Sequence, residues 1–343
     1  MHDPVLILNI LFAALSDGAY SLVVGCLLAG YWLGAAVTPE HPASSVKAAP
    51  ARGLRHACFA GVVALVVAQL VRPWFASASM SGSSSFTKNL ALIPDVLSST
   101  HQGKVWYVGS AALLALLATA IIPPQQARAV TTSLFFASLL VIGCAKAASG
   151  HAANGGDFTL AEFSMLLHVL SVAVWSGAVL ASGLLVLPHL AHLRDPAVFW
   201  RYGSLLSKTA TWALLALLAS GVYTSDRELN GTLSSLWRSG WGRILMIKGT
   251  FVLAALTLGA LSRFRCLQRP STSQRVTLMV RLVRTEAMVM ICSILCLSGI
   301  LANTPPAMTE SRRSRWWEIS ELSNLRPVLP SRRIRCCLYS SPR

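Results

Sequence analysis

The sequence has few charged residues. Only 12% of its 343 residues are Asp, Glu, Lys or Arg, and 54% are apolar, whereas about a quarter of the residues in soluble domains are charged. This composition is therefore not that of a soluble globular domain. It is typical of a protein that lies largely within a membrane.

Motifs of several enzyme and metal-site classes are also absent. The eight cysteines include no CxxC pair, so neither a zinc site nor a disulfide framework is indicated. We recognise no nucleotide-binding motif and no nucleophile with an adjacent base. We therefore expect that the protein is not an enzyme and that it does not drive transport with ATP.

Long apolar runs take up most of the chain. Eight have about the 20 residues that a helix needs to cross a membrane core of roughly 30 Å. Backbone amides in lipid must be hydrogen-bonded within their own segment, so these spans are helices. The predicted fold is all-α, a polytopic membrane helix bundle of about eight transmembrane helices, at 16–36, 57–75, 104–122, 130–149, 161–187, 204–224, 242–263 and 285–303.

The spans divide the chain into three regions. Residues 1–150 form an N-terminal membrane half with four spans and an outer loop at 77–103, and residues 151–310 form a second membrane domain with the other four spans. Residues 311–343 contain eight arginines and no apolar periodicity. Such a basic tail is typical of a disordered or interfacial segment.

The placement of basic residues predicts the orientation. Loops 1–2, 3–4, 5–6 and 7–8 hold thirteen Lys and Arg residues, and the remaining loops with their flanks hold six. Cytoplasmic loops are enriched in Lys and Arg, so both termini are predicted to lie outside the cytoplasm. In the inner membrane of a Gram-negative bacterium this side is the periplasm, and the net charge of +16 then requires no nucleic-acid partner.

Histidine and methionine residues gather on the predicted outer side. His151 follows the fourth span, His168 lies roughly 12 Å below the outer end of the fifth span, and the outer loop adds Met80 and His101. Imidazole binds copper in either oxidation state, and the thioether of methionine favours Cu(I). These four residues are therefore candidate copper ligands. A core histidine bonded to a neighbouring carbonyl remains the structural alternative for His168, and an exposed Met80 needs no ligand role.

Two further residues of the spans have candidate supporting roles. Trp175 shares one helix stripe with His168. Lys248 is expected either to pair with an outer-side carboxylate such as Asp17 or to extend its ammonium group to the membrane surface.

Two other charged residues receive a structural interpretation. Lys146 is expected to extend its ammonium group to the membrane surface. Glu286 falls in the first turn of the last predicted span, where the helix dipole favours a carboxylate.

Four stretches of the sequence form an ordered set. They are "SGHAA" with Gly150 and His151, "LLHVLSVAVWSGAVL" with His168, Trp175 and Gly177, "WGRILMIKG" with Gly242, Leu245 and Lys248, and "RTEAMVMICSILCLSGILANTPP" with Arg284, Glu286, Pro305 and Pro306. The set resembles the copper resistance protein D family (CopD/PcoD) of multi-span inner-membrane proteins. The resemblance runs from about residue 5 to residue 308 and leaves the tail unmatched.

The resemblance implies copper handling at the inner membrane, often with a small periplasmic copper-binding protein of the CopC type, and movement of copper toward the cytoplasm. The leading hypothesis is that copper enters at the outer side through His151 and His168, with help from His101 and Met80. One alternative is a membrane redox protein in which His168 ligates haem. Another is a non-transporting assembly or sensor subunit that docks a periplasmic copper protein.

Overall fold

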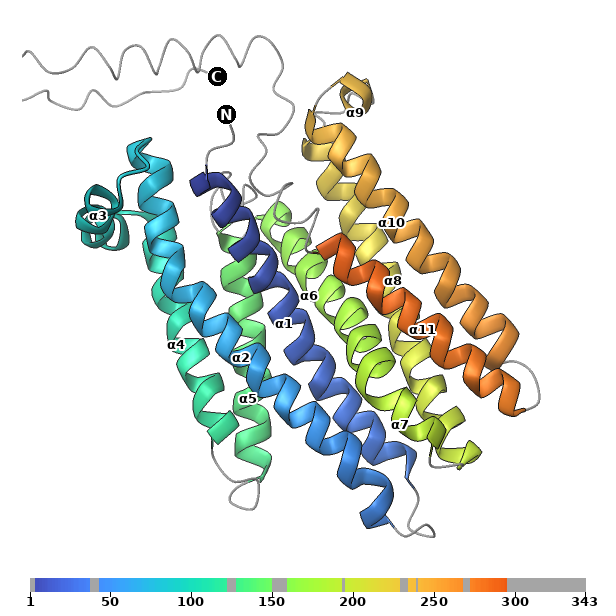
Figure 1. Ribbon diagram of the computed structural model, residues 1–343. Helices are drawn as coiled ribbons and strands as arrows, with labels where there is room; N and C mark the ends of the chain where they lie inside the picture. Colours follow the sequence, from blue (N-terminus) through green and yellow to red (C-terminus); the bar gives the residue numbers. More distant parts are fainter. Residues whose placement is uncertain are drawn as a thin grey trace, which may run out of the picture.

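The structure is a computed structural model that describes residues 4–37, 43–121, 128–149, 159–192, 195–228, 234–238, 240–267 and 272–294. All regular structure in these ranges is helical, which confirms the predicted all-α fold (Figure 1). The elements are α1 (Pro4–Ala36), α2 (Ala43–Ser81), α3 (Phe86–Ser99), α4 (His101–Ile121), α5 (Arg128–Ala148), α6 (Leu160–Ala181), η2 (Ser182–Val186), α7 (Leu187–His192), α8 (Pro196–Glu228), α9 (Ser235–Arg238), α10 (Gly240–Ser262), η3 (Arg263–Leu267) and α11 (Ser273–Ser293).

The long helices run side by side, as a membrane bundle requires. Within the described residues, six helical stretches are long and apolar enough to cross a membrane: 4–36, 49–81, 130–148, 160–192, 196–227 and 242–267. The helices at the other two predicted spans, α4 and α11, lie in the same bundle (Figure 1). The chain is therefore a multi-pass membrane protein.

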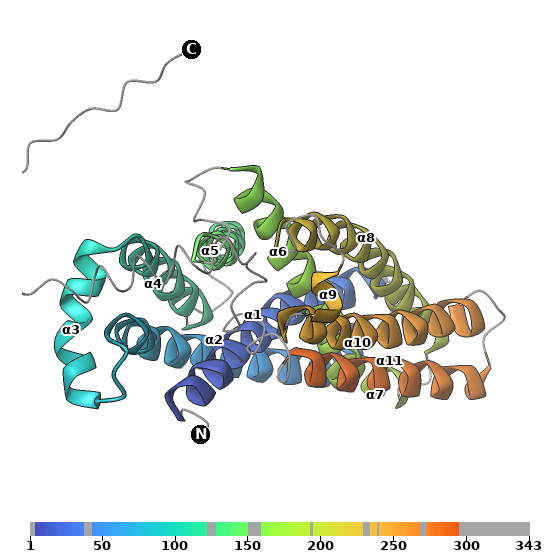
Figure 2. The same ribbon diagram turned by 90° about the horizontal axis from the view of Figure 1, so that it is seen from above.

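Several predicted segments differ from the structure. α1 begins at Pro4 and α2 at Ala43, whereas the first two spans are predicted to begin at residues 16 and 57. The last span was predicted to start at residue 285, but α11 begins at Ser273 and is described to Ser293. The predicted outer loop at 77–103 contains the end of α2 and the 14-residue helix α3. Seen from above the bundle, α3 lies at its edge beside α4 (Figure 2).

Close contact between α1 and α6 holds the two halves of the chain together. A Cβ atom added to Gly25 would lie 1.9 Å from the carbonyl oxygen of Gly177, and one added to Gly177 would lie 2.0 Å from that of Ser21. Small residues at such crossings let helix backbones approach in a membrane, where water provides no hydrophobic force between helices. The α1–α6 pair is thus the central contact of the bundle.

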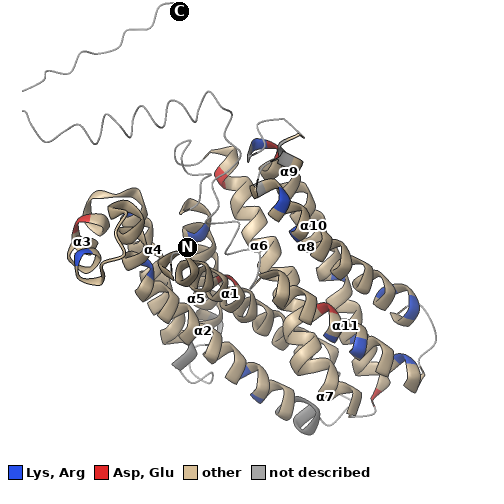
Figure 3. Cartoon of the chain, turned by 45° about the horizontal axis from the view of Figure 1, so that its top comes forward, with Lys and Arg blue, Asp and Glu red and all other residues tan. Residues whose placement is uncertain are grey.

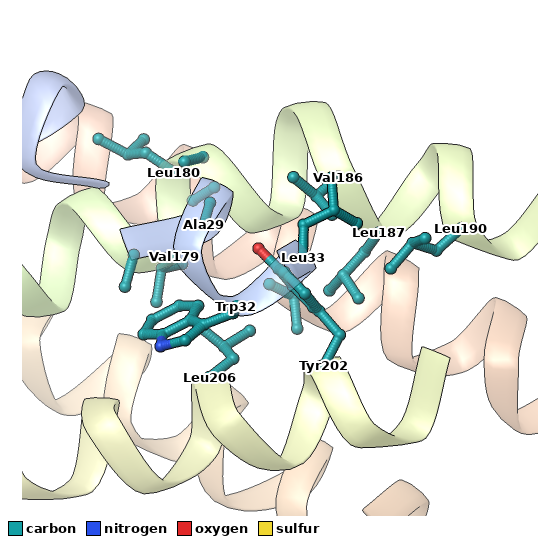
Figure 4. Packing of buried hydrophobic residues seen from close by; sticks show 14 of the residues in the cluster. Ala29, Trp32, Leu33, Val179, Leu180, Val186, Leu187, Leu190, Tyr202 and Leu206 are labelled. Atoms are coloured by element: carbon teal, nitrogen blue, oxygen red, sulfur yellow. The ribbon is translucent and has the colours of Figure 1, made fainter. Parts of the chain in front are cut away.

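A cluster of buried apolar side chains extends this contact to α8. Trp32 of α1 packs edge-on against Tyr202 of α8, with their ring centroids 6.0 Å apart (Figure 4). The Tyr202 hydroxyl lies 2.8 Å from that of Ser182, at the point where α6 continues through the π-helical turn η2 into α7. The polar group of a buried tyrosine is therefore satisfied inside the apolar core.

Charged residues are sparse along the helices (Figure 3). A charged group inside a membrane-spanning helix is costly, and it usually faces the bundle interior or a cavity. The few ionisable residues in the middle of the helices are therefore the natural starting points for a functional site.

Candidate functional site

The predicted polar stripe of α6 faces the interior of the bundle. Ser164, Ser171 and Trp175 are buried, and His168 between them is partly buried. Residues at these spacings lie above one another on a helix. The stripe therefore holds His168 against neighbouring helices rather than against lipid.

Ser220 of α8 is the hydrogen-bonding partner of His168. Its hydroxyl oxygen lies 3.4 Å from the Nδ1 atom of the imidazole. The neighbouring Gly221 also lies beside the ring, since a Cβ atom there would be in van der Waals contact with the Cε1 atom of His168 at 3.5 Å. A serine followed by a glycine thus forms the wall of α8 against which the imidazole rests.

The hydrogen bonds of Ser220 also indicate which nitrogen of the imidazole carries the hydrogen. The Ser220 hydroxyl lies 2.8 Å from the carbonyl oxygen of Ala216 and 3.1 Å from that of Leu217. Because a hydroxyl has one hydrogen to donate, its oxygen is left to accept a hydrogen bond from Nδ1–H. The Nε2 lone pair, which no described residue engages, is then available to a metal ion.

An ion pair connects α1 and α5. The carboxylate of Asp17 on α1 is 2.8 Å from the ammonium nitrogen of Lys146 on α5, which also donates to the Ser16 hydroxyl at 2.8 Å. Arg72 of α2 donates to the Ser149 hydroxyl in the same region. Lys146, which is predicted to extend its ammonium group to the membrane surface, thus has Asp17 as its partner, whose side chain is 43% exposed.

Lys248 of α10 lies within electrostatic reach of both Asp17 and His168. Of the two predicted roles, pairing with Asp17 is not seen: the ion pair of Asp17 in the described part of the chain is with Lys146. Lys248 is partly buried on α10, and its role stays a prediction.

His101 and Met80 lie at the ends of their helices, away from the α6–α8 contact. His101 is the first residue of α4, and its Nε2 atom lies 3.3 Å from the carbonyl oxygen of Ala148 at the end of α5. Met80, near the end of α2, is 56% exposed. His151 lies outside the described residues. Within those residues, no three His, Cys, Asp or Glu side chains gather closely enough to hold a metal ion.

The buried carboxylate of Glu286 is the feature that sequence reasoning missed. The residue was assigned to the first turn of a helix, and this is wrong, because α11 begins thirteen residues earlier at Ser273. Glu286 is only 5% exposed and accepts a hydrogen bond from the indole of Trp175. The available signal was the periodicity of the segment before it, where Met279, Val283 and Glu286 follow one buried helix face.

Comparison with known proteins gives two family matches. Residues 1–160 match the profile described as copper resistance protein D-like, N-terminal domain, and residues 196–300 match the profile of copper resistance protein D. The copper transport protein CutJ of Bacillus subtilis (strain 168) is 29% identical over 181 residues. That alignment covers 49% of this chain and 31% of the relative, so the match spans about a third of that protein. No solved structure matches the chain.

Proposed function

Because this chain belongs to the copper resistance protein D family and so has a role in copper handling, we propose that it binds copper at the outer face of the bacterial inner membrane and passes it toward the cytoplasm. In this proposal both termini are periplasmic, and His168 is the ligand within the membrane. The observation that carries the proposal is the position of His168, fixed on Ser220 with its Nε2 atom free of a described partner.

The outer ligands complete a route of increasing depth. His101 lies beside the carbonyl oxygen of Ala148. Gly150 and His151 follow Ala148 in the sequence by two and three residues. We assign His101, His151 and the soft thioether of Met80 to capture at the outer rim, since these donor types suit copper. A small periplasmic protein of the CopC type would deliver the ion there.

Weak binding at His168 fits passage better than storage. A conducting route needs a site that is favourable enough to enter and weak enough to leave. A single imidazole meets this condition, while the ion pair of Asp17 and Lys146 holds α1 against α5 beside the route. The protein carries out no covalent chemistry in this mechanism.

Copper content and copper uptake of cells test the proposal. His151→Ala combined with His168→Ala is expected to lower both, because the rim ligand and the membrane ligand are lost together. His189→Ala is the matched control, since this exposed histidine of α7 bonds the carbonyl oxygen of Leu185 in the adjoining turn η2. Unchanged uptake and copper binding in the double variant would refute the role of these histidines. A Soret band in the purified protein would instead identify haem.

A further inference from the structure

A second polar site lies in the other half of the bundle, on the side predicted to be cytoplasmic. A cavity of about 200 Å³ is lined by α6, α8, α10, η3 and α11. Its walls are mostly apolar, but Glu286 faces it from α11, and Arg263 faces it from η3. The volume is large enough for several water molecules, each of which needs roughly 30 Å³ in the liquid.

Glu286 is held in this cavity without a cationic partner. The carboxylate accepts a hydrogen bond from Trp175, and within the described residues it makes no ion pair. Arg263, the other charged residue of the lining, donates to the Thr211 hydroxyl at 2.7 Å instead. An ionised carboxylate in apolar surroundings is unfavourable unless it is paired. We therefore expect this group to bind either a metal cation or a proton.

The residues that line the cavity also indicate which positively charged species can bind to Glu286. A metal cation such as Na⁺ or Mg²⁺ needs several oxygen ligands, but beside the one carboxylate the cavity offers only the neutral hydroxyls of Ser207, Thr211 and Ser262. A proton needs only one carboxylate oxygen. Gly259 of α10 keeps the space beside that oxygen open, because a Cβ atom there would lie 3.4 Å from Oε1 and 3.6 Å from Oε2.

We infer that Glu286 is a proton-binding site that exchanges its proton through the cavity between α6, α8, α10 and α11. The site goes beyond the proposed copper function and does not depend on it. The two sites are nevertheless connected, because Trp175, which bonds Glu286, lies seven residues after His168 on the same stripe of α6. Copper that binds at His168 and a proton that leaves Glu286 would therefore both affect side chains on the same face of α6.

Infrared spectroscopy of the purified protein without copper tests this inference. Difference spectra across a pH series are expected to contain the carbonyl band of a protonated carboxylic acid, and this band should shift in D₂O because the cavity admits solvent. Glu286→Gln should remove the band. Asp226→Asn, at the exposed end of α8, is the matched control and should leave it in place. Glu286→Asp keeps a carboxyl group if the amide variant does not fold, and should move the band.

A pair of glycine variants probes the same group without changing it. Gly259→Ala places a methyl group against the carboxylate and should shift the band. Gly249→Ala on the same helix meets nothing within 4 Å and should not. A band that persists in Glu286→Gln, is absent from the unchanged protein, or fails to exchange with D₂O would overturn the inference. Because no copper is present, this outcome is separate from any failure of the histidine variants.

Discussion

In the proposed function, Ser220 sets which imidazole nitrogen of His168 is left for a metal ion. The serine has no ionisable group, and its hydroxyl bonds within its own helix. Because the hydroxyl hydrogen is used in that bond, the hydroxyl oxygen is available to accept a hydrogen bond from Nδ1–H of His168, 3.4 Å away. Partners of this kind set the tautomer of metal-binding histidines and are often as important for affinity as the ligands themselves.

Ser220→Ala is therefore expected to weaken copper binding by about tenfold, the lower end of the usual effect of removing such a partner. Ser220→Thr keeps the hydroxyl and should restore affinity. Thr224→Ala is a suitable control, because the hydroxyl of Thr224 donates only to the carbonyl oxygen of Ser220. Copper titration measures the affinity, and ¹⁵N shifts of His168 report its tautomer. Equal affinity in Ser220→Ala and the unchanged protein would contradict the role.

At the scale of elements, the α1–α6 contact positions the candidate site. α6 carries the stripe from Ser164 to Trp175, and its distance from α1 depends on the absence of side chains at Gly25 and Gly177. Close backbone contact between membrane helices comes from packing, which tolerates extra volume poorly. A change far from His168 can therefore displace it.

Gly25→Ala is expected to destabilise the protein by about 1–3 kcal/mol or more, the usual cost of overpacking, because the new methyl group meets the backbone of Gly177. Gly34→Ala lies on the same helix and meets nothing within 4 Å, so it should be neutral. Thermal unfolding in detergent gives both values. Equal melting temperatures for the two variants would show that the helices separate easily at this crossing.

At the scale of the whole molecule, the orientation decides the direction of the route. α3 and the start of α4 lie at one end of the bundle, and η3 and the start of α11 lie at the other (Figure 1). The charge distribution predicts that the first end is periplasmic and the second cytoplasmic. His168 would then lie nearer the outside, and the Glu286 cavity nearer the inside.

Cysteine labelling in intact cells tests this orientation. In a protein whose native cysteines are replaced, Thr87→Cys on α3 should react with a membrane-impermeant maleimide added outside, and Ser273→Cys at the start of α11 should react only after the cells are opened. Both positions are exposed, so a difference in labelling reports the side of the membrane on which each residue lies. The reverse pattern would invert the proposed direction of copper movement.

The sequence by itself determined the membrane class, the all-α fold and the approximate positions of the spans. These follow from local properties: the length of apolar runs and the requirement that backbone amides in lipid be satisfied within a helix. The stripe of α6 was also predictable, because helical spacing places His168 and Trp175 on one face.

Only the tertiary structure decided which polar groups meet. Asp17 and Lys146 are 129 residues apart in the sequence and pair because α1 lies beside α5. Ser220 reaches His168 because α8 packs on α6. The apolar run predicts a helix that begins just before Glu286, whereas α11 begins at Ser273 with a polar and largely exposed first turn. Composition and spacing describe one helix at a time, and these contacts depend on which helices become neighbours.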